Sequence, residues 1–249
     1  MKIRKISAIS STNAYLKQLV LESRLESFTV VSADYQNKGK GQATKQWFSE
    51  KGKNLLFSIL IKFNSLDISK QAFLNFAISI GIYQALKQHY PIIKIKWPND
   101  IMADDKKISG ILIENSVKGS LINHSIVGIG LNVNQLKFST EIPNAVSLRN
   151  LLNKEFYRDV LLVELLDSIQ KQISLLAEKD LGTLKANYEK NLYKKGIPSM
   201  FKTTNNKPFL GKIIGVSSIG LLQIELENGA IKEFANKEVF FNNAFEAED

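Results

Sequence analysis

The sequence predicts an α+β fold, with a mixed, largely antiparallel sheet, flanking helices and a small C-terminal β barrel. Apolar runs typical of strands dominate the middle of the chain, and two of their three joins are too short for a crossover helix, which implies antiparallel neighbours. Two long segments carry apolar residues at helical spacing. After Pro198 the apolar runs become short and are separated by Gly or Asn.

The first predicted elements are three strands and a helix. Residues 3–9 predict a short strand, and Ser10–Asn13 offers hydroxyl and amide caps for a helix that ends near Ser23. The β-branched run Thr29–Ala33 predicts a second strand. Residues 54–63 are nearly all apolar, as expected of a strand that is buried on both faces.

A helix, three strands and a second helix follow. The first helix covers residues 69–90 and must end there, because a proline comes next. Residues 93–97 alternate apolar side chains with lysines, which predicts a strand with one face in the core. Residues 108–114 and 121–134 predict two further strands, and residues 155–178 predict a long amphipathic helix.

The pattern changes after the segment Tyr193–Pro198. Short apolar runs recur over residues 200–234, and Asn228-Gly229 is a two-residue hairpin signal. These features predict a small all-β unit, a little barrel. The predicted domains are therefore a larger one over residues 1–194 and a C-terminal β domain over residues 195–249.

Composition limits the classes of function. The 249 residues include no cysteine, which excludes disulfides, thiolate nucleophiles and cysteine-based zinc sites. No apolar run approaches the roughly 20 residues that cross a bilayer, and no secretory signal begins the chain, so we expect a cytoplasmic protein with no membrane partner. The net charge of +9 suits a nucleic acid, a polyphosphate or an acidic protein surface, or serves solubility alone.

A polar loop between two predicted strands combines glycines with lysines, in Lys38-Gly39-Lys40-Gly41-Gln42. Glycines let the backbone approach a ligand and turn its N–H groups toward it. The lysines favour an anion such as a phosphate or a carboxylate. Solvated loops of this composition are common, and the spacing is not that of a Walker loop, so the loop alone does not define a site.

Three further segments place polar or small residues at strand ends. Lys96-Trp-Pro-Asn-Asp100 contains turn formers beside an aromatic ring, although a simple strand end would look similar. Lys106-Lys107 follows in a turn, where it would otherwise be a solvated hairpin tip. Gly128-x-Gly130-x-Asn132 permits a close approach of backbone, but no helix follows as a dinucleotide fingerprint requires.

In their order and spacing these segments resemble the catalytic domain of biotin protein ligases. The matching segments are residues 11–13, 34–49, 96–100, 107–114 and 128–132. The match covers residues 6–148, and the β unit after Gly196 resembles the SH3-like C-terminal domain of the same family. The resemblance implies a catalytic domain of the type shared by class II aminoacyl-tRNA synthetases and biotin ligases.

The resemblance also implies a reaction that uses biotin, ATP and Mg²⁺. In this family the biotin carboxylate attacks the α-phosphorus of ATP to give biotinyl-adenylate and pyrophosphate. A lysine of a biotin carboxyl carrier protein then displaces AMP. Two anions must meet in the first step, so cationic and backbone donors are needed to offset their repulsion. Magnesium is expected to enter with ATP and to need few protein ligands, so no metal ligand is assigned to the chain.

Taken motif by motif, the resemblance assigns three groups of residues. The catalytic group is Lys107, Lys40 and Asp100, with Lys107 at the biotin carboxylate and α-phosphate and Asp100 near the carrier lysine. The biotin-binding group is Ser11, Thr12, Asn13, Gln36, Gly39, Lys40, Lys107 and Gly110. The group that binds ATP or the adenylate is Lys40, Gly41, Gln42, Trp47, Lys96, Asn99 and Asn132.

The loop departs from the family pattern, which usually continues Gly-Arg-Gly-Arg-x-Gly-Arg before its tryptophan. Lys40 keeps the charge but loses the bidentate fork of arginine. Gln42 and Ala43 remove charge, and Thr44 replaces a glycine. We predict a looser clamp on the adenylate and some leakage of it, and strong retention in an adenylate-release assay would contradict this.

Three other interpretations stay open from the sequence alone. A lipoate or octanoate protein ligase shares the fold and the adenylate chemistry, but the polar trio Ser11, Thr12 and Gln36 favours the ureido ring of biotin. A nucleic-acid-binding module is suggested by the charge and the terminal barrel, but the clustered arginines and stacking aromatics typical of such modules are missing from the sequence. A pseudoenzyme that only binds biotin is compatible with the altered loop. The chain begins almost at the catalytic domain, so DNA binding is not expected, and a homodimer is compatible with the family.

Overall fold

The computed structural model describes residues 2–42, 46–140, 142–178 and 180–242. The strands of the larger sheet are β1 (Lys2–Ile6), β2 (Thr29–Ala33), β3 (Leu55–Asp67), β4 (Ile93–Lys96), β5 (Asp100–Ala103), β6 (Lys106–Lys118) and β7 (Leu121–Leu131). The helices are α1 (Thr12–Glu22), the short 3-10 helix η1 (Ile68–Lys70), α2 (Gln71–Lys87), α3 (Leu148–Leu152), α4 (Arg158–Ala177) and α5 (Leu181–Lys190). The strands of the smaller sheet are β8 (Pro198–Thr203), β9 (Pro208–Val216), β10 (Leu222–Leu226), β11 (Ile231–Phe234) and β12 (Val239–Phe241).

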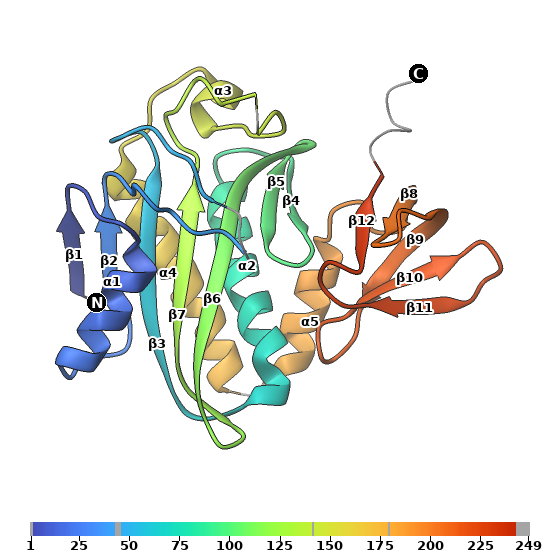
Figure 1. The fold of residues 1–249 in the computed structure, drawn as a ribbon, viewed down its shortest axis with the longest axis horizontal. Helices are drawn as coiled ribbons and strands as arrows, with labels where there is room; N and C mark the ends of the chain where they lie inside the picture. Colours follow the sequence, from blue (N-terminus) through green and yellow to red (C-terminus); the bar gives the residue numbers. More distant parts are fainter. Residues whose placement is uncertain (1, 43–45, 141, 179, 243–249) are drawn as a thin grey trace.

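The two sheets have the predicted character (Figure 1). Seven strands form the larger sheet in the order β1-β2-β3-β7-β6-β5-β4, and five form the smaller one in the order β11-β10-β9-β8-β12. Strands β1 and β2 pair in parallel, and their neighbours in the larger sheet pair antiparallel. The short joins between β5, β6 and β7 therefore make hairpins, as expected. The α+β prediction is confirmed.

Helices cover both faces of the larger sheet. In Figure 1, α1 lies in front of the sheet, whereas α2 and α4 lie behind it. The side chains of β3 divide between the two faces. Phe57 and Ile59 pack in the main core with α2 and α4, and Leu60 packs with Leu16 of α1 in a second cluster. This arrangement explains why the β3 segment is apolar on both faces.

The start of α1 is set by Ser11. Its hydroxyl accepts a hydrogen bond from the Ala14 N–H at 3.5 Å, and its backbone is extended, as in an N-cap. Thr12 and Asn13 follow in the first turn and are buried. The cap therefore directs a cluster of polar side chains onto the sheet.

Hydrogen bonds join the smaller sheet to the larger part of the molecule, and two of them involve Trp97 and Glu189. The Trp97 indole N–H donates to Gly220 O at 2.9 Å. The Glu189 carboxylate of α5 accepts from the Val216 N–H of β9 at 3.0 Å. A Cβ added at Gly215 would lie 2.6 Å from this carboxylate, so a glycine is needed for the contact. The division at residues 194 and 195 stays a prediction.

The sequence did not predict β5, β12, α3 or α5. Each is short or largely polar, so local periodicity gives little signal. In the described part of the chain, no helix combines the length and the apolar character needed to cross a bilayer.

Candidate active site

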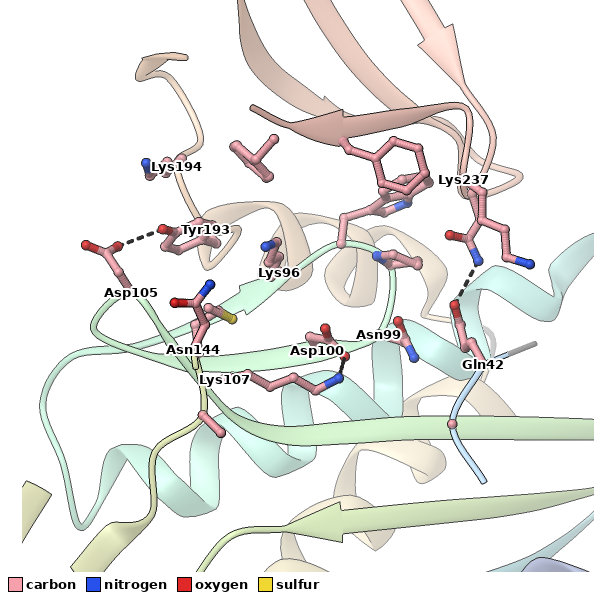
Figure 2. A pocket seen from close by; sticks show the side chains of 18 of the residues that line it. Gln42, Lys96, Asn99, Asp100, Asp105, Lys107, Asn144, Tyr193, Lys194 and Lys237 are labelled. Carbon is pink, nitrogen blue, oxygen red and sulfur yellow. Dashed lines mark hydrogen bonds and ion pairs between the residues drawn. The ribbon is translucent and has the colours of Figure 1, made fainter. Parts of the chain in front are cut away.

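Two adjoining cavities lie where the motifs converge. The larger has a volume of about 850 Å³ and is lined by the larger sheet, the segment 142–145 and the smaller sheet (Figure 2). The other has a volume of about 50 Å³ and is lined by the start of α1, the Gln36–Gln42 loop, β6 and β7. The residues that line both cavities are Gly41, Gln42, Trp47, Asn99 and Lys107. These five residues are called the junction below.

A chain of hydrogen bonds organises the smaller cavity. Gln36 Oε1 accepts from the Thr12 N–H at 2.7 Å and from the Thr12 hydroxyl at 3.0 Å. Ser58 Oγ lies 2.7 Å from Thr12 Oγ1 and 2.6 Å from Asn13 Oδ1. Asn13 Nδ2 donates to Glu114 Oε2 at 2.8 Å. Since the Gln36 carbonyl is occupied, its amide NH₂ group is the part that is left for a ligand.

Sequence reasoning missed Ser58 and gave Glu114 no role. Ser58 is fully buried in β3 and joins the two α1 side chains to the sheet. A signal for it was present, because Ser58 is the polar residue inside the apolar run Leu55–Ile61. Glu114 ends one of the matched motifs, but its link to Asn13 spans 101 positions and depends on the fold.

An ion pair lies at the junction. Lys107 Nζ is 2.6 Å from Asp100 Oδ1, and both side chains are half-buried (Figure 2). The same ammonium lies 5.7 Å from the centre of a Trp47 ring, within the range of a cation–π contact. The structure thus brings two of the predicted catalytic residues together, and it places Lys40 on the exposed loop at the smaller cavity.

The glycine pattern of β6 and β7 makes room for Trp47. A Cβ at Gly130 would lie 2.4 Å from the Trp47 ring, and one at Gly110 would lie 3.1 Å from it. The predicted close approach at these glycines is therefore made by a side chain of the same chain. Trp47 Nε1 is buried without a hydrogen-bond partner among the described residues. A buried unpaired donor is costly, which suits a group that pairs with a ligand.

The two asparagines assigned to ATP are held by backbone carbonyls. Asn99 Nδ2 donates to Ile111 O at 2.6 Å, and Asn132 Nδ2 donates to Val146 O at 3.1 Å. Their amide groups are thereby fixed at the wall of the larger cavity. Lys96 lies on the same wall, with its ammonium 5.2 Å from the centre of the Phe241 ring.

Most of the residues predicted from the motifs line one of the two cavities. Those at the smaller cavity are Ser11, Thr12, Asn13, Gln36, Lys40, Gly41, Gln42, Trp47, Asn99, Lys107 and Gly110. Those at the larger cavity are Gly41, Gln42, Trp47, Lys96, Asn99, Asp100, Lys107 and Asn132. Gly39 is buried and lines neither cavity. A Cβ at this position would lie 2.5 Å from Trp47 O, so a larger residue does not fit. The departures at Ala43 and Thr44 lie outside the described residues.

Tyr188 supports the segment that carries Asn99 and Asp100. Its hydroxyl donates to Pro98 O at 3.3 Å, and Asn75 Nδ2 donates to the same carbonyl at 2.5 Å. Burial, reinforced by the charge of Asp100, raises the pKa of Tyr188 far above its ordinary value. Tyr188 therefore stays a neutral donor at any physiological pH.

The smaller sheet contributes residues that sequence reasoning also missed. Asn236 Nδ2 donates to Gln42 Oε1 at 2.9 Å, which joins the smaller sheet to the junction (Figure 2). Lys237 and Phe240 line the larger cavity beside it. Within the described residues, no group of three or more His, Cys, Asp or Glu side chains is placed to hold a metal ion.

Comparison with known proteins identifies the family. The model of the biotin/lipoate A/B protein ligase family matches residues 6–132. The chain belongs to this family. The resemblance seen in the motifs is thereby confirmed, and so is the prediction that the chain is a biotin protein ligase-type enzyme.

Named relatives agree with this membership. The bifunctional ligase/repressor BirA of Bacillus spizizenii is 29% identical over 232 residues, which are 91% of this chain and 70% of the relative. BirA of Escherichia coli is 27% identical, over 96% of this chain and 74% of the relative. Among solved structures, the biotin protein ligase from Aquifex aeolicus in complex with biotin and ATP has a TM-score of 0.80 and 29% identity, covering 97% of this chain and 98% of that one.

Proposed function

We propose that this ligase forms biotinyl-5′-AMP and pyrophosphate from biotin and MgATP, and then transfers biotin to a lysine of a biotin carboxyl carrier protein. One observation carries the proposal. The smaller cavity, with its hydrogen-bonded Thr12, Asn13 and Gln36, meets the larger, lysine-lined cavity at Lys107. The ring of biotin and the polyphosphate of ATP would thus be held so that the biotin carboxylate and the α-phosphate meet at the Lys107 ammonium.

In the first step a biotin carboxylate oxygen attacks the α-phosphorus of ATP. The new P–O bond forms as the bond to the bridging oxygen of pyrophosphate breaks. Lys107 would offset the repulsion of the two anions, and Asp100 holds its ammonium in place at 2.6 Å. Lys40 would add a second positive charge from the loop.

The head group would bind beside α1. The Gln36 NH₂ group would donate to the ureido oxygen of biotin, since the Gln36 carbonyl is already paired with Thr12. The smaller cavity, at about 50 Å³, has room for only a few water molecules and is too small for a bicyclic ring. Biotin would therefore enter as the Trp47 ring moves away from Gly110 and Gly130, after which the ring would cover the adenylate.

In the second step the carrier amine attacks the acyl carbon, the bond to AMP breaks and the amine loses a proton. Asp100 is the carboxylate at the junction that would orient the amine or accept this proton. Magnesium would be held mainly by the ATP phosphates. The carrier, a homodimer and a cytoplasmic location stay predictions.

Pyrophosphate release with MgATP tests the first step, with biotin and lipoate compared as substrates. We expect release with biotin, and a loss of at least about 100-fold in Lys107→Ala. Lys106→Ala is the matched control, because Lys106 is exposed and lines neither cavity. Release with lipoate alone would assign the chain to lipoate instead. If neither acid gives pyrophosphate release, the chain would be a binding protein and not a ligase.

A further inference from the structure

The turn between β11 and β12 holds a lysine in a conformation that favours glycine. The Glu238 N–H donates to Ala235 O at 3.1 Å, which closes a four-residue turn. Lys237 is the third residue of this turn and has a φ of 72°. A turn with positive φ at its third residue prefers glycine there, because a side chain is crowded. The turn would therefore be less strained without the lysine.

Lys237 lies next to the junction. Its neighbour Asn236 donates to Gln42 Oε1 at 2.9 Å, and Gln42 lines both cavities. Figure 2 shows Lys237 beside Gln42, on the side of the larger cavity where Asn99 lies. Lys194 and Asp105 lie on the opposite side. Lys237 therefore lies near the place where the α-phosphate would meet Lys107.

Within the described residues, no ion pair neutralises the charge of Lys237. Lys107, the lysine that belongs to the junction, has Asp100 at 2.6 Å. Among the described residues, no carboxylate lies within 4.0 Å of the Lys237 ammonium. An uncompensated cation that lines a cavity favours an anionic ligand there. Strained backbone is also commonly kept where a side chain has a function.

We propose that Lys237 binds the β- or γ-phosphate of ATP, and the pyrophosphate as it leaves. The inference rests on the proposed function, which places the α-phosphate at the junction. The β- and γ-phosphates extend away from it into the larger cavity, where Lys237 supplies a cation from the smaller sheet. The smaller sheet thus contributes directly to nucleotide binding.

The test compares three variants, Lys237→Gly, Lys237→Arg and Lys207→Ala. The last is the control, because Lys207 is an exposed lysine of the same sheet region and lines neither cavity. For Lys237→Gly we expect KM for ATP and the inhibition constant of inorganic pyrophosphate to rise about 5- to 10-fold, while KM for biotin changes less than about twofold. Its Tm should stay equal or rise, because glycine relieves the turn. Lys237→Arg should restore ATP binding, and Lys207→Ala should match the wild type.

Two outcomes would overturn the role of Lys237. One is an unchanged KM for ATP in Lys237→Gly, and the other is an equal rise of both KM values, which would mean that the lysine only shapes the cavity. If the wild type releases no pyrophosphate with biotin, the proposed function fails first. Calorimetric binding of magnesium pyrophosphate then still tests Lys237, and equal affinities of wild type and Lys237→Gly would contradict the inference.

Discussion

At the scale of single residues, a few buried polar groups prepare the smaller cavity for a neutral ring. Ser58 does not line the smaller cavity, but it holds Thr12 and Asn13 in place. Thr12 in turn holds Gln36. Buried networks of this kind stabilise one arrangement only when each member is paired. Under the proposed function, the recognition of biotin would therefore depend on a serine that lies outside the matched motifs.

Replacing Ser58 with alanine should weaken biotin binding without a direct effect on ATP. Two hydrogen-bonding partners lose their contact, so we expect KM for biotin to rise about tenfold and the free energy of unfolding to fall by about 1–3 kcal/mol. Steady-state pyrophosphate release and urea unfolding measure the two effects. Ser79→Ala is the control, since the Ser79 hydroxyl is buried without a partner in the described structure. Equal losses in both variants would argue against the network.

Gly130→Ala should disable the site by narrowing the smaller cavity. The new Cβ would lie 2.4 Å from the indole ring, closer than any stable contact, and it would also enter the smaller cavity. We expect biotin-dependent pyrophosphate release to fall at least about tenfold and the tryptophan emission to change. Gly182→Ala in α5 has open space and should stabilise the protein by about 0.5–1 kcal/mol. Full activity in Gly130→Ala would show that biotin does not need the space beside Gly130.

At the scale of elements, α5 joins the two sheets through one carboxylate. Glu189 accepts from Lys185 Nζ at 2.7 Å and from the Val216 N–H at 3.0 Å, and Lys195 lies 3.8 Å away. Burial acts to raise the pKa of Glu189, but the hydrogen bonds and the two lysine charges outweigh it and leave the pKa below its usual 4.5. The contact between α5 and β9 thus requires the ionised acid.

This contact predicts a dependence of stability on pH. A carboxyl group with a lowered pKa in the folded state stabilises the protein above pH 4.5, and this contribution is lost as the pH falls through the folded-state pKa. We expect Glu189→Gln to reduce the free energy of unfolding by about 1–2 kcal/mol at pH 7 and by less at pH 3. Denaturant unfolding at both pH values measures this, with the exposed Glu227→Gln as control. A constant difference between pH 7 and pH 3 would contradict the ionic role.

At the scale of the whole molecule, we infer that the net charge of +9 favours docking of an acidic carrier protein. An acidic carrier would be attracted over a distance, and salt would screen this attraction. The same charge also acts on ATP, so the two effects must be separated. Comparing two acceptors of the same adenylate achieves this.

Raising the ionic strength should therefore slow transfer to the carrier selectively. From about 50 to 200 mM salt, we expect the rate at low carrier concentration to fall several-fold. Capture of the adenylate by hydroxylamine, a small acceptor that carries no charge at neutral pH, should change much less under the same conditions. Equal salt effects on both acceptors would mean that the positive charge has no role in carrier docking.

The sequence predicted the elements whose signal is local. The predicted strand Thr29–Ala33 has the same bounds as β2, because a β-branched run between polar segments favours a strand. The predicted strand at residues 121–134 ends at Leu131, where Asn132 turns to bond Ile108 O and Val146 O. Helices such as α3, with five residues, form through caps and tertiary contacts, and periodicity does not reveal them.

The sequence by itself determined the α+β class, the order of the motifs and, through them, the family and a set of polar and glycine residues that line the two cavities. Those features depend on residue types and on short spacing along the chain. The tertiary structure decided which side chains meet, such as Trp47 with Gly130, Ser58 with Thr12, and Asn236 with Gln42 across 194 positions. Such contacts form only when strands and helices pack, since burial and distance in space have no counterpart in local spacing.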